Sequence, residues 1–466
     1  MPDPTAARRS GLHPYAGRFT VHDRLPDAGV AREEVLAEIA TMAEEEDRRY
    51  HDGQVSGSIY SGDEEHYAFL TQAYARFAHA NVLQRDMYPS ATKMEGEIIA
   101  MTADMLHGDG DTGGVVTSGG TESLMNAMLV YREWGRETKG VADPQVIMPV
   151  TAHPALDKGC HYFGIDAIKA PVTDDFTVDV DWVSDHIGPR TVALVGTAGT
   201  YPHGLVDDIG ALAGLASEHG LGMHVDGCLG GFILPWGRDL GYDVPEFDLA
   251  VDGVSSMSAD THKYGYALKG SSVLLYRPKA LRHHQYFMAL DWPGGAYSAP
   301  GMSGSRSGGI IAATWASMVS LGRDGYRRIA ADIFATAAAL VEAISAQPEL
   351  RVLGRPFFNV AFTSASDEVD IYHVNDHLAS KGWRMNGLQL PPALHFCVTR
   401  PNTQPGVVER FAADLSDAVA YARQPHDRPP RSGAMYGSAG ARPPADQVRA
   451  GLVKYLDATH EVGPLG

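Results

Sequence analysis

Short apolar segments alternate with amphipathic helical segments from about Met94 to Leu321. Residues 145–148 and 192–195 are two of the apolar segments, and both are short enough to be strands. Strands that are separated by helices favour a mostly parallel sheet, because two parallel neighbours must be joined by a crossover connection. This pattern predicts an α/β domain, in which ligands bind at the carboxyl edge of the sheet.

One lysine of this region, Lys263, stands shortly before the apolar segment 271–276. A lysine in such a place is usually a solvated edge residue, because burial of an ammonium group is costly. The other interpretation is chemical: desolvation lowers the pKa of a lysine, and the neutral amine can form a Schiff base with an aldehyde. Pyridoxal 5'-phosphate (PLP) carries such an aldehyde, and its binding also requires a carboxylate and a phosphate-binding turn.

A carboxylate and a suitable turn both occur upstream. Asp226 follows the apolar segment 221–225 and precedes glycines, which places it at the carboxyl end of a strand, although an aspartate that starts a turn gives the same pattern. The Gly119–Thr121 turn lies between a β-branched segment and a helical one, where free backbone N–H groups can bind phosphate. It lacks the P-loop lysine and the dinucleotide fingerprint, so the sequence predicts PLP rather than a nucleotide.

Longer segments around these residues resemble one protein family. They are Thr117–Ser123, His224–Asp226 and Ala259–Ser272, followed by Asp291–Tyr297, Gly304–Gly309, Lys381–Trp383 and Gln389–Cys397. On these segments the chain resembles soluble, bacterial-type sphingosine-1-phosphate lyases, which belong to the group II PLP-dependent decarboxylases of fold type I. The resemblance extends from about Tyr60 to about Ala458.

The resemblance implies an α/β fold like that of aspartate aminotransferase. Its large domain contains a mostly parallel seven-stranded sheet, and a smaller α+β domain and an N-terminal helical arm complete it. We expect the arm in residues 1–93, the PLP-binding domain in 94–321 and the small domain in 322–466. Within the small domain, residues 329–344 predict a long Ala-rich helix, and the Pro- and Gly-rich segment 424–444 predicts a mobile loop.

The resemblance also assigns the cofactor-binding residues. Lys263 would bind PLP covalently, Asp226 would pair with the pyridine nitrogen, and His153 would stack over the ring. The phosphate group would be bound by Gly119, Gly120, Thr121 and His262 of one subunit and by Ser305 of a partner subunit. The resemblance therefore implies a homodimer with a shared active site.

Other residues are assigned to the substrate. Tyr201 and Tyr60 would act with Lys263 and His153 in catalysis, since a phenol can transfer protons when nearby cations lower its pKa. The substrate phosphate would be bound by Tyr60, Asn81, Lys269 and Tyr297, together with Gln84. Gln84 stands where the family has a histidine, so one cationic contact is weaker.

The implied reaction is a retro-aldol cleavage of the C2–C3 bond of a phosphorylated sphingoid base, with a long-chain aldehyde and phosphoethanolamine as products. A PLP-dependent amino-acid decarboxylase, or an aldolase-type lyase for another amine, would share the lysine, the aspartate and the histidine. A catalytically silent binding protein of the same fold is disfavoured because all three residues are present.

Composition limits the possible partners and compartments. The 38 basic and 57 acidic residues give a formal charge of −19, which disfavours nucleic acid and anionic membranes as partners. The 20 histidines are scattered, and we expect no metal site. Three cysteines without paired spacing suit a reducing cytoplasm. The N-terminus lacks the apolar core of a signal peptide, and no apolar segment is long enough for a transmembrane helix.

Overall fold

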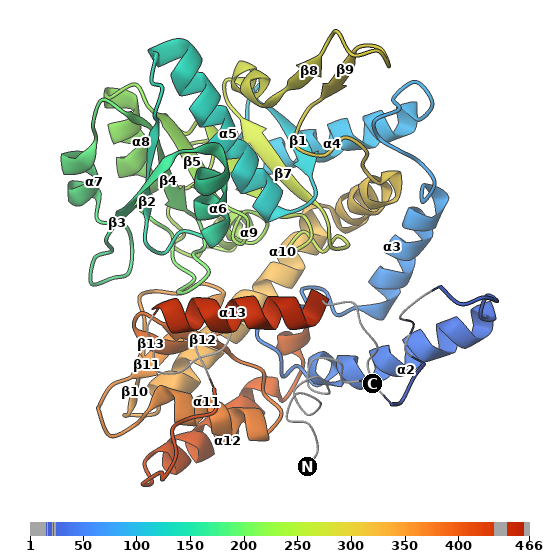
Figure 1. Cartoon of the computed structure of the whole chain (residues 1–466). Helices are drawn as coiled ribbons and strands as arrows, with labels where there is room; N and C mark the ends of the chain where they lie inside the picture. Colours follow the sequence, from blue (N-terminus) through green and yellow to red (C-terminus); the bar gives the residue numbers. More distant parts are fainter. Residues whose placement is uncertain (1–14, 16, 21, 23–24, 433–444, 461–466) are drawn as a thin grey trace.

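The computed structural model describes residues 15, 17–20, 22, 25–432 and 445–460. Its larger part is built on a seven-stranded sheet with the order β1-β7-β6-β5-β4-β2-β3 (Figure 1). The strands from β6 to β3 pair in parallel, whereas β7 pairs antiparallel with both β1 and β6. The strands are β1 (Gly113–Thr117), β2 (Gln145–Pro149), β3 (Asp166–Ala170), β4 (Thr191–Thr197), β5 (Gly222–Asp226), β6 (Ser256–Ala259) and β7 (Ser272–Tyr276).

Both faces of this sheet are covered, because successive side chains of one strand enter two different hydrophobic cores. Val116 and Ile147 belong to one core, and their neighbours Val115 and Val146 belong to the other. The first core includes residues of α4 (Pro89–Met105), α7 (Val180–His186), α8 (Ile209–Glu218), α9 (Leu234–Asp239) and α10 (Gly308–Ser345). The second includes residues of α5 (Gly120–Lys139) and α6 (Pro154–Phe163).

A four-stranded antiparallel sheet, in the order β10-β11-β13-β12, forms the C-terminal part. The helix α10 connects the two parts, since it contacts α4 at one end and β10 and β11 at the other. The elements of this part are β10 (Leu350–Val352), β11 (Asn359–Ser364), α11 (Ile371–Ser380), β12 (Asn386–Gln389), β13 (Pro392–Cys397), the 3-10 helix η2 (Arg400–Thr403) and α12 (Val407–Ala422).

Three further groups of elements lie outside the two sheets. Helices α2 (Arg32–His51) and α3 (Glu64–Arg76) form the N-terminal segment, and α13 (Ala445–His460) is the last helix. A hairpin of β8 (Phe287–Ala289) and β9 (Tyr297–Ala299) follows the 3-10 helix η1 (Lys279–Gln285) and projects from the larger part (Figure 1). None of the helices in the described residues is both long and apolar enough to cross a membrane.

The fold class predicted from the sequence is confirmed, with its mostly parallel seven-stranded sheet and its separate C-terminal sheet. The helix predicted for residues 329–344 lies in the second of two helical pieces of α10, which meet at a kink where Gly322 has non-helical backbone (φ 56°). We propose to keep the domain boundaries at residues 93 and 321, and the kink at Gly322 supports the second of them.

The segment predicted as a mobile loop is described in its first part only. Residues 424–432 run beside α11, where Asp376 accepts hydrogen bonds from the backbone N–H groups of Arg431 (2.6 Å) and Ser432 (2.8 Å). Residues 433–444 lie outside the described residues.

Candidate active site

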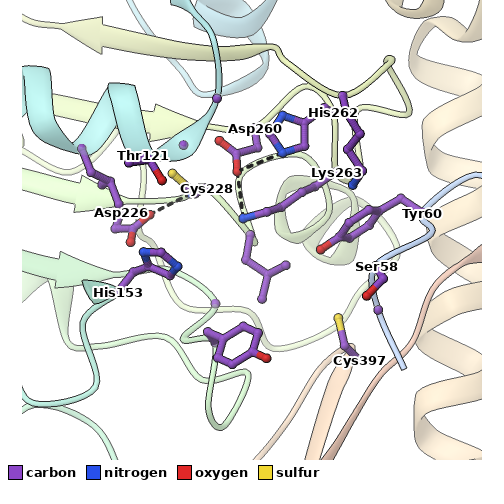
Figure 2. A pocket seen from close by; sticks show the side chains of 18 of the residues that line it. Ser58, Tyr60, Thr121, His153, Asp226, Cys228, Asp260, His262, Lys263 and Cys397 are labelled. Carbon is purple, nitrogen blue, oxygen red and sulfur yellow. Dashed lines mark hydrogen bonds and ion pairs between the residues drawn. The ribbon is translucent and has the colours of Figure 1, made fainter. Parts of the chain in front are cut away.

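A cavity of about 490 Å³ lies at the carboxyl edge of the large sheet. His153 follows β2, Tyr201 follows β4, Asp226 ends β5 and Lys263 follows β6. Because these four strands are parallel, their carboxyl ends meet at one edge and bring the four side chains to the same cavity. Figure 2 shows three of them, His153, Asp226 and Lys263, around the cavity.

The turn between β1 and α5 forms one wall of the cavity. Gly119 has a φ of 146°, which side chains rarely adopt, and a Cβ at Gly120 would lie 2.8 Å from both carboxylate oxygens of Asp260. The carboxylate of Glu122 accepts hydrogen bonds from the backbone N–H (2.8 Å) and the hydroxyl (2.5 Å) of Ser118, which fixes the start of the turn. The first N–H groups of α5 therefore remain available to an anion.

Lys263 is paired with a carboxylate that sequence reasoning did not single out. Its Nζ lies 2.8 Å from Oδ2 of Asp260, which is 2% exposed (Figure 2). Burial alone would lower the pKa of Lys263, but the neighbouring Asp260 raises it well above its ordinary value. A lysine deprotonated by burial is therefore not what this state contains, because Asp260, Tyr60 and Cys228 together more than offset the effect of desolvation on the pKa of Lys263.

The backbone turn that carries Lys263 is held from two sides. The carbonyl of Gly265 accepts hydrogen bonds from the hydroxyls of Ser317 and Tyr326 in α10, each at 3.0 Å. The hydroxyl of Tyr264 donates to the carbonyl of Val398 in the C-terminal part at 2.6 Å. The position of the lysine thus depends on both parts of the molecule.

Asp226 and His153 lie close together on the other side of the cavity (Figure 2). Asp226 is 3% exposed, and its Oδ1 accepts the backbone N–H of Cys228 at 3.0 Å. Nδ1 of His153 accepts the N–H of Ala155 at 3.1 Å as the cap of α6, so the proton of the neutral ring is on Nε2. Burial lowers the pKa of His153, although Asp226 acts in the opposite direction.

Two tyrosines and a second lysine form the outer part of the cavity. The Tyr60 ring packs edge-on against Tyr264, with 4.9 Å between centroids, and Nζ of Lys269 lies 4.7 Å from the centre of the Tyr60 ring. The Tyr201 ring packs edge-on against His395 at 4.8 Å. Lys269 is exposed at the rim, yet desolvation and then the charge of Lys263 lower its pKa to about 8.

Most of the residues assigned from the sequence line this one cavity: Tyr60, Gly119, Gly120, Thr121, His153, Tyr201, Asp226, His262, Lys263 and Lys269. Four others do not line it: Asn81, Gln84, Tyr297 and Ser305. Nδ2 of Asn81 donates to the hydroxyl of Ser305 at 2.9 Å, and the backbone N–H of Gln84 donates to the carbonyl of Asn81 at 3.0 Å. Asn81, Gln84 and Ser305 thus form a second cluster, in which Ser305 belongs to the segment that follows the β8–β9 hairpin. Tyr297 in β9 lies beside this segment, since a Cβ at Gly304 would be 2.6 Å from its hydroxyl.

Sequence reasoning also missed several residues that line the cavity. Asp260 stands three residues before Lys263, and this spacing within a turn was an available signal. The C-terminal part also contributes lining residues, which only tertiary structure brings to the edge of the large sheet: Arg384, Asn386, His395 and Cys397. His395 and Cys397 lie in a segment that resembles the family, whereas Arg384 and Asn386 had no such signal. Among the described residues no cluster suited to a metal ion occurs.

Comparison with known proteins identifies the family. The model of the pyridoxal-dependent decarboxylase conserved domain matches residues 23–364. Sphingosine-1-phosphate lyase from Drosophila melanogaster is 39% identical over 417 residues, which cover 89% of this chain and 75% of the relative. The lyase from Oryza sativa is 40% identical over 453 residues, covering 95% and 83%. The chain belongs to the sphingosine-1-phosphate lyase family.

Solved structures agree with this assignment. The sphingosine-1-phosphate lyase of Burkholderia pseudomallei matches with a TM-score of 0.90 and 49% identity, over 96% of this chain and 99% of that chain. Glutamate decarboxylase of Lactobacillus brevis matches with a TM-score of 0.76 at 20% identity, which shows the shared fold alone.

The cofactor of this lyase-family chain is PLP. The cavity suits it chemically, because it combines a helix N-terminus for a phosphate, a buried carboxylate and a lysine. A further point of fit is that no side chain caps the start of α5, which leaves its first N–H groups for a bound phosphate.

Proposed function

We propose that this protein is a PLP-dependent lyase that cleaves the C2–C3 bond of phosphorylated sphingoid bases to a long-chain aldehyde and phosphoethanolamine. The observation that carries the proposal is Lys269. No carboxylate of the described residues lies within ion-pair distance of its Nζ, which faces the cavity across the Tyr60 ring. A cation without a counter-ion at the rim of a cavity is suited to bind an anionic group such as a phosphate ester.

The bound cofactor supplies an electron sink for the pair of electrons released when the bond breaks. Lys263 would bind the cofactor covalently, and Asp226 would keep its pyridine nitrogen protonated. His153 would cover the ring face. The phosphate group would be bound by Gly119, Gly120, Thr121 and His262, whose Nδ1 is fixed by the carbonyl of Ser271 at 2.6 Å.

Cleavage also requires a base for the C3 hydroxyl of the substrate. Tyr201 and Tyr60 both line the cavity and are our candidates for this proton transfer. His153 is a weaker candidate, because its Nδ1 lone pair is already used by the backbone of α6 and its Nε2 carries the proton.

We further propose that the active form is a homodimer with a shared site. The cluster of Asn81, Gln84, Tyr297 and Ser305 lies outside the cavity of its own chain, so its proposed phosphate contacts would be made in the cavity of a partner. The neighbouring β8–β9 hairpin supports this, because it exposes large apolar side chains that a partner would cover: Phe287, Met288, Leu290 and Trp292.

A cytoplasmic location completes the proposal. All three cysteines, Cys160, Cys228 and Cys397, are buried and unpaired, which is typical of a protein from a reducing compartment.

The test is to incubate the PLP-loaded protein with sphingosine 1-phosphate and to detect both products by mass spectrometry. We expect aldehyde and phosphoethanolamine in equal amounts, and neither product with the Lys263→Ala variant. Unphosphorylated sphingosine is the matched control substrate, and it should react far more slowly because it has no group for Lys269. Release of CO2 from amino acids without cleavage of the lipid would contradict the proposal and favour a decarboxylase.

A further inference from the structure

Asp260 has no role in the scheme above, although it is buried against the central lysine. Its Oδ2 lies 2.8 Å from Nζ of Lys263 and 3.8 Å from Nε2 of His262. Its Oδ1 is also buried and has no hydrogen-bond partner among the described residues. Burial of a carboxylate oxygen without a hydrogen-bond partner costs free energy. A buried, unpaired oxygen such as Oδ1 of Asp260 therefore indicates a role beyond packing.

The first part of the explanation concerns Lys263. A lysine can form a bond to an aldehyde carbon only through its lone pair, and an ammonium group has none. The charge of Asp260 keeps Lys263 protonated, because it raises the pKa of the lysine well above its ordinary value against the opposing effect of burial. The proton must therefore leave when the cofactor is bound, and Oδ2 of Asp260 lies within hydrogen-bond distance to accept it. Desolvation raises the pKa of Asp260, but the charges of Lys263 and His262 hold it below its ordinary value, so the carboxylate accepts the proton only as Lys263 gives up its charge.

The second part concerns the phosphate-binding turn. Both oxygens of Asp260 would lie 2.8 Å from a Cβ at Gly120, so the carboxylate packs directly against the first residue of α5. An ionised carboxylate would repel a phosphate group bound by this turn. Transfer of one proton to Asp260 removes this repulsion and at the same time frees the lone pair of Lys263.

We propose that Asp260 accepts the proton of Lys263 when the lysine becomes covalently bonded to the cofactor. One of the three Nζ protons moves to the carboxylate of Asp260. Nζ then forms the double bond to the aldehyde carbon, and the carbonyl oxygen leaves as water with the other two Nζ hydrogens. The proton on Asp260 returns to Nζ when the lysine is released.

Other titratable groups around this pair also contribute to its pH dependence. His262 is the closest of them to Asp260, and burial lowers its pKa. The remaining groups that act on Asp260 or Lys263 are Tyr60, His153, Cys228, Lys269 and Cys397.

The proposal is tested by the rate at which PLP binds covalently to the apoprotein between pH 6 and 9, followed by the absorbance of the lysine-bound cofactor. Nα-acetyl-lysine is measured in parallel, because the phosphate of PLP has a pKa of about 6. With an internal acceptor, the rate constant of the wild-type protein should change less than twofold. In Asp260→Asn the carboxylate that raises the lysine pKa is gone, so burial lowers this pKa. The proton must then go to solvent, and the rate should rise about tenfold per pH unit up to the lowered lysine pKa and level off above it.

Two results would overturn the proposal. The first is a rate of covalent PLP binding that rises tenfold per pH unit in the wild-type protein. This result would overturn the proposal without any variant. The other is an Asp260→Asn profile as flat as the wild-type profile. Asp166→Asn, which neutralises an exposed carboxylate paired with Arg190, is the matched control and should stay flat. If Asp260→Asn fails to fold, Asp260→Glu replaces it in the test. This variant retains a carboxylate acceptor, so its rate should depend on pH as little as the wild-type rate does. A rate that rises steeply with pH in Asp260→Glu would contradict the proposed role of Asp260. The lipid substrate is not involved, so the outcome is independent of the proposed lyase activity.

Discussion

Lys269 is the residue whose ionisation we expect to set the upper pH limit of substrate capture. Desolvation and the charge of Lys263 lower its pKa to about 8, so in the free enzyme it loses its charge as the pH rises through this value. A phosphate monoester stays dianionic above pH of about 6. The attraction between the two is therefore present below pH 8 and is lost above it, and kcat/KM for the phosphorylated substrate should fall over that range.

Lys269→Gln checks this expectation. The variant should raise KM about tenfold or more at pH 7, since it removes a charge-assisted hydrogen bond, and the decline of kcat/KM above pH 8 should disappear. PLP content should remain normal. Lys158→Gln, at an exposed lysine on α6, is the control and should change neither quantity. A decline above pH 8 that persists in Lys269→Gln would assign the limit to another group.

Sequence alone located the residues whose chemistry depends on local pattern. Lys263, Asp226 and the Gly119–Thr121 turn each stand at the end of a recognisable strand, so their meeting at one sheet edge followed from the expected topology. The sequence did not reveal the charge state of Lys263, because this depends on how the turn brings Asp260 next to the lysine. The distance between Nζ of Lys263 and the Asp260 carboxylate follows from backbone geometry and not from spacing in the sequence.

At the scale of single elements, the first turn of α5 is tightly constrained. A Cβ at Gly120 would lie 2.8 Å from Asp260 and 3.0 Å from the sulfur of Cys228, so Gly120→Ala must displace the carboxylate or the helix. We expect this variant to fold but to bind PLP at least about tenfold more weakly, because the turn and Asp260 no longer fit together.

Equilibrium dialysis of PLP against the apoprotein measures this effect. Gly214→Ala is the matched control, because Gly214 also lies in a helix, α8, but a Cβ there would meet no atom within 4 Å. That variant should bind PLP normally and should be slightly more stable, since alanine has the higher helix propensity. Equal PLP affinity in the two variants would show that the turn does not constrain the cofactor.

Element boundaries show where sequence reasoning ends. The strands β2 and β4 were anticipated because both are short, apolar and flanked by breaks. The long helix α10 was recognised only in its Ala-rich half, since Gly308, Gly309 and Gly322 resemble helix breaks in a linear sequence. Gly322 does interrupt the helix with non-helical backbone. Gly308 and Gly309 do not, because they are buried in the helix, where a side chain would collide with Ala80 and Tyr74.

At the scale of the whole molecule, the cluster around Ser305 is rigidly built although it lies outside the cavity. Oδ1 of Asn81 accepts the backbone N–H of Arg306 at 3.2 Å, and the partly buried Arg306 forms an ion pair with the buried Glu95 of α4 (2.5 Å). Arg306 also donates to the carbonyl of Val116 in β1 at 3.0 Å. A polar cluster fixed in this way is suited to present Ser305 to another molecule, in agreement with the proposed shared site.

Mixed dimers test whether the site is shared. Lys263→Ala removes the lysine, and Ser305→Asp places a negative charge where we propose a phosphate contact, so each variant alone should be inactive. In a heterodimer of the two, a shared site places both defects in one cavity and leaves the other intact. Heterodimers purified through two different tags should therefore show about half of the wild-type activity. If each chain used its own Ser305, both cavities would be defective, and activity would stay at the level of the single variants.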